Sequence, residues 1–276
     1  MFGTKTALLW TASPIREVLE SMQRGFFVSG IAGTMAQQKL DTITHNLANI
    51  NTAGYRADRT SFSTIFSNQN ESGANIDQNP AAYLSLSGQY VDVREGIIKQ
   101  TGNELDFAIH GAGYFRVMKE DGGEAYTRAG NFRLDAEGNL LTQGGLPVLD
   151  NAGSPITLIA GAISVTSDGA IYVDSDGTGQ IAAEAVAELG IITINDLTQI
   201  KKGAHTVIET SAANTTPAGP EVSVHQGSLE GSNVNSVLAM TEMVAAMRSY
   251  QSMMKVVEQY NQLAGQVSER VGVIQG

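Results

Sequence analysis

Apolar residues recur at steps of three and four at both ends of the chain, and this spacing predicts two long amphipathic helices. The N-terminal seam comprises Gly33, Ala36, Leu40, Ile43, Leu47 and Ile50. The C-terminal seam comprises Met240, Met243, Met247, Tyr250, Met254, Val257, Asn261 and Ala264. Two such seams favour pairing of the terminal helices as a coiled coil.

Polar residues mark where the first helix ends and the last one begins. Asn49, Asn51 and Gly54 tolerate a left-handed backbone, so the first helix is predicted to stop there. Asn46, Asn49 and Asn51 either set the register between helices or only cap and end the helix. Asn233, Asn235 and Ser236 are natural N-caps for the last helix.

The middle of the chain has a different periodicity. Short apolar runs recur there every eight to twelve residues and are separated by turns rich in Asp and Gly, which predicts an all-β domain. Residues 182–189 fit either a helix or a strand. The predicted fold is therefore α+β, with the β domain inserted between the two terminal helices.

The predicted domain order has six parts. They are an N-terminal extension (1–21), the N-terminal helix with its signature segment (22–66), a loop with linker strands (67–104), the β-rich middle domain (105–211), a linker (212–231) and the C-terminal helix (232–276). The extension either contains a short accessory helix or precedes a natural start at Met22. Its apolar run is too short for a signal peptide, and no apolar run is long enough to span a membrane.

Composition removes several classes of function. The chain has 276 residues, and its 28 acidic against 17 basic residues give a net charge of −11, which disfavours nucleic-acid binding. It has no cysteine, which excludes thiol catalysis and disulfides. No two of the four histidines have the i, i+4 spacing of metal ligands. We therefore predict no enzymatic activity, no catalytic or metal-binding residues and no cofactor.

Energetics indicates that the N-terminal helix needs a partner. Burying its apolar seam is worth roughly 8–12 kcal/mol at most. Fixing the backbone of some twenty residues costs about 1–2 kcal/mol each, and the helical hydrogen bonds return only part of that cost. The seam must therefore be covered by another surface.

Four blocks of the sequence resemble the flagellar rod and hook (axial) protein family. The segment from Asn46 to Tyr55 matches the rod-protein signature, and the segment from Leu105 to Phe115 is similar to the central motif. The segment from Tyr126 to Phe132 is similar to the block that follows. The segment from Gly227 to Asn235 resembles the entry to the C-terminal helix. The blocks occur in the order that the family has and span most of the chain.

The resemblance implies a structural subunit of the flagellar basal-body rod that polymerises into a helical tube, transmits torque and encloses the export channel. It implies copies of the chain, homologous rod and hook subunits and the flagellar export apparatus as partners, with neither nucleic acid nor a small-molecule substrate. It also implies an extracytoplasmic location in the periplasmic rod region, reached without a cleaved signal peptide. The expected assembly interface comprises Leu40, Ile43, Asn46, Leu47, Asn49, Ile50, Asn51, Gly54, Tyr55, Asn233, Met240, Met243, Met247, Tyr250, Met254 and Val257.

Two alternatives remain open at this point. One keeps the family and makes the chain a distal-rod or hook subunit, although the segment from Met253 to Val257 is closer to the proximal-rod branch. The other is a secreted carbohydrate-binding or hydrolytic β protein, which requires an aromatic platform or a carboxylate pair in the β domain. The single tryptophan, Trp10, lies outside that domain.

Overall fold

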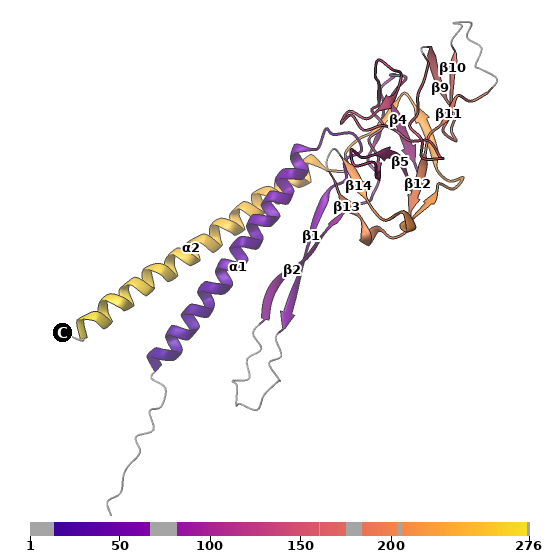
Figure 1. The fold of residues 1–276 in the computed structure, drawn as a ribbon. Coiled ribbons are helices and arrows are strands. Elements are labelled where there is room, and N and C mark those ends of the chain that lie inside the picture. The colour runs from indigo at the N-terminus through magenta and orange to yellow at the C-terminus, as the bar shows by residue number, and fades with distance from the viewer. Residues whose placement is uncertain (1–13, 67–81, 160, 175–183, 204–205, 275–276) are drawn as a thin grey trace, which may run out of the picture. The chain divides into compact units, whose positions relative to one another are not determined.

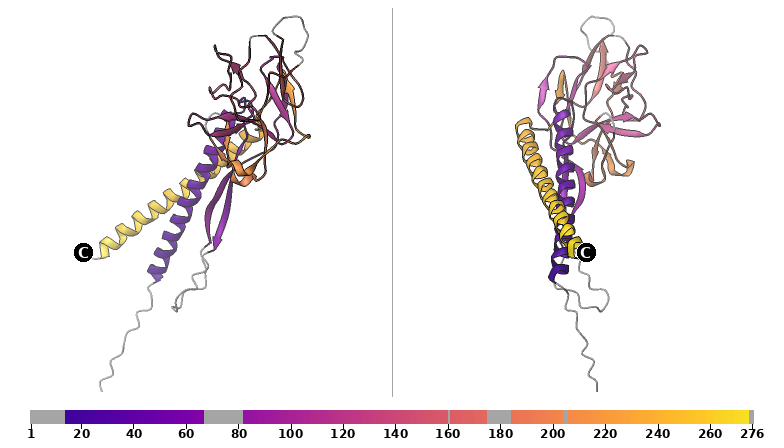
Figure 2. Two further views of the ribbon diagram at one scale, coloured as in Figure 1. Left: turned by 45° about the vertical axis from the view of Figure 1, so that its right-hand side comes forward. Right: turned by 90° about the vertical axis from the view of Figure 1, so that its left-hand side faces the viewer.

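A computed structural model of the chain describes residues 14–66, 82–159, 161–174, 184–203 and 206–274. It shows an α+β fold, as the sequence predicts, with one long helix at each end and strands between them (Figure 1). Helix α1 spans Pro14–Ala48 and helix α2 spans Ser236–Ile274. Both helices run without interruption (Figure 2). Residues 14–21, expected in a separate extension, are continuous with α1, because proline fits the first turn of a helix.

Strands account for most of the remaining regular secondary structure. They are β1 (Asp58–Phe66), β2 (Ala82–Val91), β3 (Ile98–Gln100), β4 (Phe107–His110), β5 (Gly113–Met118), β6 (Glu124–Thr127), β7 (Arg133–Leu134), β8 (Leu140–Leu141), β9 (Ala162–Val165), β10 (Ala170–Asp174), β11 (Ala187–Glu188), β12 (Ile191–Ile194), β13 (Lys201–Lys202), β14 (Val207–Glu209), β15 (Thr215–Pro217), β16 (Ser223–Gln226) and β17 (Ser228–Glu230). Two 3₁₀ turns, η1 (Leu197–Gln199) and η2 (Ala212–Asn214), complete the list.

The strands form one large antiparallel sheet and several small ones. The large sheet has the order β13-β14-β6-β5-β12-β15, and a three-stranded sheet has the order β11-β10-β9. Two-stranded pairs join β1 to β2, β4 to β16, β3 to β17 and β7 to β8. The pairs of β4 with β16 and of β3 with β17 bring residues near 100 beside residues near 225.

Three expectations about the middle of the chain need correction or completion. Residues 212–231, predicted as a linker, contribute three strands, because threonine and proline can occupy an edge strand such as β15. Residues 58–66, predicted within the N-terminal helical segment, form β1. The described part of 182–189 contains strand β11, and residues 67–81 lie outside the described chain.

The large sheet is buried on both faces, because alternate residues of its strands enter different apolar clusters. Phe115 of β5 and Ile191 of β12 belong to the larger cluster, whereas their neighbours Tyr114 and Ile192 belong to the smaller one. Continuous apolar runs in the sequence are typical of strands that are covered on both sides.

The chain divides into two compact units. One contains Met1–Ile43, Thr60–Gly88 and Met240–Gly276, and the other contains Thr44–Arg59 and Gln89–Ala239. The boundary between the units therefore falls within each long helix. The last turn of α1 and the first turn of α2 belong to the β-rich unit.

No helix in the described ranges has an apolar stretch that could cross a membrane.

Candidate functional site

The four sequence blocks that resemble the axial family come together within the β-rich unit. Gly54 follows the end of α1, has φ of +64°, and donates its backbone N–H to the carbonyl of Glu230 at 2.8 Å. A Cβ atom at this position would lie 2.3 Å from the backbone nitrogen of Ala129. Both the left-handed backbone and the close approach therefore require glycine here. We call this meeting point the junction.

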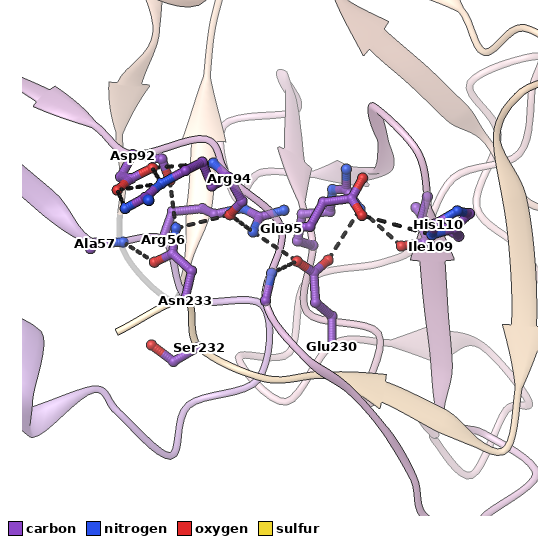
Figure 3. Close-up of polar contacts among 12 residues, drawn as sticks. Arg56, Ala57, Asp92, Arg94, Glu95, Ile109, His110, Glu230, Ser232 and Asn233 are labelled. Atoms are coloured by element: carbon purple, nitrogen blue, oxygen red, sulfur yellow. Dashed lines mark hydrogen bonds and ion pairs between the residues drawn. The ribbon is translucent and has the colours of Figure 1, made fainter. Parts of the chain in front are cut away.

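Three buried charges lie at the centre of the junction, and each comes from a different region of the chain. Glu230, at the end of β17, forms an ion pair with Arg56 Nη1 at 2.7 Å and accepts a hydrogen bond from Arg128 Nη1 at 3.1 Å. The three side chains are 1–3% exposed. The backbone N–H of Gly96 also donates to Glu230 Oε1, at 2.7 Å (Figure 3). One carboxylate thus links the N-terminal signature, the block around Arg128 and the entry to α2.

The buried charges are imperfectly balanced. Two guanidinium groups face one carboxylate, and within the described chain Nε and Nη2 of Arg56 and Nε of Arg128 have no hydrogen-bond partner. Burial lowers the pKa of Arg128, and the charge of Glu230 opposes this shift. Desolvating ions is costly, so such a network contributes little net stability while intact. Glu230 is the carboxylate that both guanidinium groups share, so its loss would leave two buried cations without their ion-pair partner.

Arg128 also ties the network to the central motif. Its Nη1 donates to the carbonyl of Ile109 at 3.0 Å, and its Nη2 donates to the carbonyl of Gly111. Its guanidinium lies 5.0 Å from the ring centroid of Tyr114, within the range of a cation–π contact. The central motif is therefore held by a side chain of the following block.

Asn233 joins three segments through one side-chain amide. Its Oδ1 accepts from the backbone N–H of Ala57 at 2.8 Å. Its Nδ2 donates to the carbonyls of Asp92 at 2.8 Å and Arg94 at 2.9 Å (Figure 3). The sequence predicts Asn233 as a helix cap, but its side chain bonds to these distant segments. Asn235 fills the capping role, with its Oδ1 accepting from the N–H of Leu238 at 3.0 Å.

Asn46 performs a similar task from the other terminal region. Its Oδ1 accepts from the backbone N–H of Asp58 at 2.8 Å, and its Nδ2 donates to the carbonyl of Asp58 at 2.8 Å. The side-chain amide pairs with both backbone groups of Asp58, as a neighbouring strand would. It thereby holds the segment that follows Tyr55 against the last turn of α1. Asn46 and Asn233 therefore bind the adjacent residues Asp58 and Ala57.

Tyr55 and Lys202 pack over the same returning segment. The hydroxyl of Tyr55 donates to Asn46 Oδ1 at 3.0 Å, and Lys202 Nζ lies 3.8 Å from the centroid of the tyrosine ring. Lys202 also binds Asp58 Oδ1 at 3.0 Å and the carbonyl of Arg56 at 2.8 Å. Burial, assisted by Asp58, raises the pKa of Tyr55 well above its ordinary value. Burial lowers the pKa of Lys202.

The junction brings together some of the residues that the sequence singled out. Asn46, Gly54, Tyr55 and Asn233 all lie in it. Asn49 closes the helix instead, with its Nδ2 donating to the carbonyl of His45 at 2.9 Å. Asn51 is exposed.

Sequence reasoning missed the charged members of the junction, which are Arg56, Arg128, Lys202 and Glu230. The available signal was the position of Arg128 and Glu230 within motif blocks that are otherwise apolar or small.

The helices carry two kinds of apolar surface. The N-terminal seam is covered or partly covered in the structure, with Ile43 buried and Leu40, Leu47 and Ile50 partly buried. On α2 the covered positions are Ala239, Met243, Ala246, Tyr250, Met253, Val257 and Tyr260. Gly25 and Gly33 of α1 lie against Tyr260 and Met253 of α2. Small residues on α1 therefore face large ones on α2.

Part of the predicted C-terminal seam faces a different way. Met243, Tyr250 and Val257 are on the covered side, but Met240, Met247 and Met254 are 44–54% exposed. Val237 and Val244 are exposed too, so these five residues form a stripe at steps of three, four, three and seven. We call it the methionine stripe. A helix with one covered and one open apolar stripe has surface for a further helical neighbour.

Among the described residues, the titratable side chains are those from which a metal site or a catalytic site could be built. Nowhere among them do three or more His, Asp or Glu side chains gather in a way that could hold a metal ion. The perturbed pKa values of Tyr55 and Lys202 follow from packing in the junction, with the two side chains in contact over Asp58.

Comparisons with known proteins agree on one family. Residues 32–56 match the profile described as "Flagella basal body rod protein". Residues 108–183 match "Flagellar hook protein FlgE/F/G D1 domain", and residues 225–270 match "Flagellar basal body rod FlgEFG protein C-terminal". These ranges contain most of the junction, including Asn46, Arg56, Arg128 and Glu230.

Full-length relatives give the same result. The chain is 33% identical to the flagellar basal-body rod protein FlgG of Agrobacterium fabrum over 259 residues, which cover 87% of this chain and 96% of that protein. It is 35% identical to FlgG of Bacillus subtilis, covering 83% and 92%. It is 30% identical to FlgF of Caulobacter vibrioides, covering 86% and 94%. With its four motif blocks converging on one buried junction, the chain belongs to the flagellar basal-body rod protein family and is a structural subunit of the rod.

Proposed function

We propose that this subunit assembles by covering the methionine stripe of α2 with helices of neighbouring rod or hook subunits, including copies of itself. The observation that carries the proposal is the stripe itself, which leaves about half of Met240, Met247 and Met254 open to solvent. Methionine suits such an interface because its flexible side chain adapts to slightly different neighbours. The contact is head-to-tail and does not close on itself, so it propagates as a helical tube.

The N-terminal part of α1 offers a second open surface. Phe26, Phe27, Val28 and Ile31 are exposed there. We propose that α1 and α2 pair within one subunit through their covered faces, as a coiled coil, and contact neighbours through their open ones. The expected interface residues of the two helices then divide between an intramolecular seam (Leu40, Ile43, Leu47, Met243, Tyr250 and Val257) and an intermolecular stripe (Met240, Met247 and Met254).

The free energy available from burying the methionine stripe indicates that assembly requires a pre-existing binding site. Burying the open half of one apolar side chain is worth about 1 kcal/mol, so the five residues of the stripe supply about 5 kcal/mol. An interaction of about 4 kcal/mol corresponds to a dissociation constant of about 1 mM, before the entropy of association is considered. A single contact is therefore too weak, and growth requires a site where several neighbours bind at once.

The junction supplies the mechanical side of the proposal. It holds the last turn of α1 and the first turn of α2 within the same compact unit as the β domain. In this proposal, Arg56, Glu230 and Asn233 fix the two helix ends within the β-rich unit, and torque enters the unit at these ends.

The incompletely covered terminal helices also bear on export. We propose that the chain passes through the flagellar export apparatus without a cleaved signal and reaches the periplasmic part of the basal body. Helices that leave one apolar stripe uncovered in the monomer lose less free energy on unfolding than fully buried elements, which eases passage through a narrow channel.

Limited proteolysis of the purified monomer, with cleavage sites mapped by mass spectrometry, tests the proposal. We expect rapid cleavage within residues 14–43 and 240–274 and a resistant core that contains 89–239. The same sites should become protected in isolated basal bodies that contain the protein. Terminal helices that resist cleavage in a monodisperse monomer would contradict assembly-dependent ordering.

A further inference from the structure

A second cluster of charges lies at the edge of the junction and is open to solvent. Asp92 accepts from Arg59 Nε at 3.0 Å, and from Nε at 2.9 Å and Nη2 at 2.6 Å of Arg94. The carboxylate is 9% exposed, whereas the side chain of Arg94 is 72% exposed. Hydrogen bonds from Arg94 and Arg59 hold the pKa of Asp92 well below its ordinary value, against the opposing effect of burial. Asp92 therefore stays ionised and pairs with the guanidinium groups of both Arg59 and Arg94.

Arg94 is unusually well fixed for an exposed side chain. Its guanidinium is held by Asp92, and its carbonyl accepts from Asn233 Nδ2 at 2.9 Å and from Arg56 Nη1 (Figure 3). An ordinary surface arginine loses up to about 2 kcal/mol of side-chain entropy when a ligand immobilises it. Much of that loss has already occurred here during folding. An immobilised guanidinium with an open face is preorganised for a planar anion.

The charge balance indicates which anion. The pair of arginines and Asp92 carry a net positive charge on a chain whose net charge is −11. The β-rich region 105–211 holds half of the 28 acidic residues but only about a third of the 17 basic ones. A positive site on one copy and an acidic domain on another are complementary.

The surroundings of Arg94 have the composition of a protein interface. Tyr90 and Ile97, from the same segment, are exposed to 54% and 75%. Strand β3, which follows, is exposed at all three positions and pairs only with β17 among the described strands. Tyrosine and arginine are enriched where interface energy is concentrated. The same stretch therefore offers an apolar side chain and a free strand edge beside the fixed guanidinium.

We propose that Arg94, supported by Arg59 through Asp92, binds a side-chain carboxylate on the acidic β domain of a second copy of this chain. The proposal rests on assembly of copies and adds a contact between β domains to the contacts between helices. Asp92 occupies Nε and one N–H of Nη2, so Nη1 and the second N–H of Nη2 form the pair of donors for the incoming carboxylate, which fixes direction as well as attraction. Because the site is exposed, salt should weaken the contact.

Zero-length cross-linking of the full-length chain tests the contact. Arg94→Lys retains the charge and supplies an amine that a carbodiimide joins directly to a neighbouring carboxylate. Mixing unlabelled protein with ¹⁵N-labelled protein separates links between copies from links within one copy, such as the one to Asp92. Arg133→Lys is the matched control, because Arg133 is an exposed arginine on β7 of the same unit.

We expect links between copies from position 94 to Asp or Glu residues of 105–211, at least about fivefold more abundant than from position 133. The yield should fall severalfold when the ionic strength is raised to about 1 M, where the Debye length is about 3 Å. Arg94→Glu should reduce association of the copies at low salt, while its thermal midpoint reports separately on folding.

Native lysines on the helices distinguish this proposal from the proposed assembly. Lys39 of α1 and Lys255 of α2 are exposed and report contacts between the helices of different copies. Links between copies through these lysines, with none through position 94, would overturn the carboxylate site and leave the proposed function intact. Links from position 94 to acids of the helices would also overturn it. A complete absence of links between copies would contradict both proposals.

Discussion

The β-rich unit and the terminal helices solve the problem of burial in opposite ways. In the β-rich unit, apolar side chains fill two clusters, and even three charged side chains are enclosed at the junction. Most of the large apolar side chains that are exposed in the described chain lie on the two helices, including Phe27, Val237 and Met240. The first region buries its apolar side chains within the chain, and the second leaves apolar side chains exposed.

The difference teaches where stability comes from in each region. The β-rich unit is stabilised by contacts within one chain, so its free energy of unfolding should not depend on protein concentration. In the proposed assembly, neighbouring subunits supply part of the surface that stabilises the helices, so helix stability should rise with protein concentration. The proposed export and assembly of the subunit would use both properties. The following experiments break or sharpen this contrast, beginning with the largest expected effect.

Replacing Glu230 by alanine should damage the self-contained unit most. The change leaves Arg56 and Arg128 buried without their anion, which typically costs about 3–5 kcal/mol. Urea unfolding followed by near-ultraviolet circular dichroism measures the effect. Glu137→Gln, at an exposed position, should change the free energy of unfolding by less than about 0.5 kcal/mol. Equal stability of the two variants would show that the charge network does not hold the junction.

Replacing Gly54 by alanine tests the close approach of the signature to the block around Arg128. We expect a loss of about 3 kcal/mol, from the left-handed backbone and from the collision with Ala129. Gly102→Ala is the matched control, because Gly102 has φ of +75° but no atom within 4 Å of its Cβ position. It should lose only the backbone part, about 1 kcal/mol. Similar losses in both variants would rule out steric contact as the reason for Gly54.

Replacing Asn233 by alanine removes three hydrogen bonds between segments that are far apart in sequence. Each bond contributes about 0.5–1.5 kcal/mol, so we expect a loss of about 2 kcal/mol. Hydrogen exchange should show faster exchange of the Ala57 amide, which Asn233 accepts. Asn235→Ala, which removes only the helix cap, should cost about 1 kcal/mol and leave that amide protected.

A pair of adjacent substitutions on α2 compares its covered and open surfaces. Ala246→Glu places a charge at a position that is 5% exposed and should destabilise the helices of the monomer by about 1–2 kcal/mol. Met247→Glu, at a position that is 44% exposed, should leave the monomer within about 0.5 kcal/mol of the parent but prevent incorporation into rods. Helical circular dichroism measures the first effect, and protein content of isolated basal bodies measures the second. Assembly of Met247→Glu at the normal level would remove the methionine stripe from the interface.

Acid should destabilise the β-rich unit through Asp92, and this is the smallest effect that we expect. The folded pKa of Asp92 is lower than its ordinary value of 3.8, so its contribution is present above that value and disappears as the pH falls below it. We expect a loss on the order of 1 kcal/mol for this group, because its arginine partners are exposed. Unfolding curves between pH 6 and about pH 3 should differ between the parent and Asp92→Asn, with a shallower decline in the variant. Parallel curves would assign the acid sensitivity to other groups.

The sequence determined the elements and their order because periodicity is a local property. The apolar seam from Gly33 to Ile50 predicts α1, and the alternation around Tyr114 and Phe115 predicts a strand in the middle domain. Asn46, Gly54, Tyr55 and Asn233 were singled out as members of the expected assembly interface, which the family resemblance implies. Asn233 was nevertheless assigned the wrong partner, since a cap is a local role and its actual bonds are to residues some 140 positions away.

Only the tertiary structure decided which charges meet and which apolar face stays open. Arg56, Arg128 and Glu230 are far apart in the chain, and a lone charged residue in a sequence usually indicates a solvated surface. The apolar residues of α2 fit two stripes about a quarter-turn apart, and periodicity alone selected Met240, Met247 and Met254 where the fold covers Ala239, Ala246 and Met253. Burial depends on which residues pack against one another in space. The order of residues along the chain does not reveal which distant segments meet.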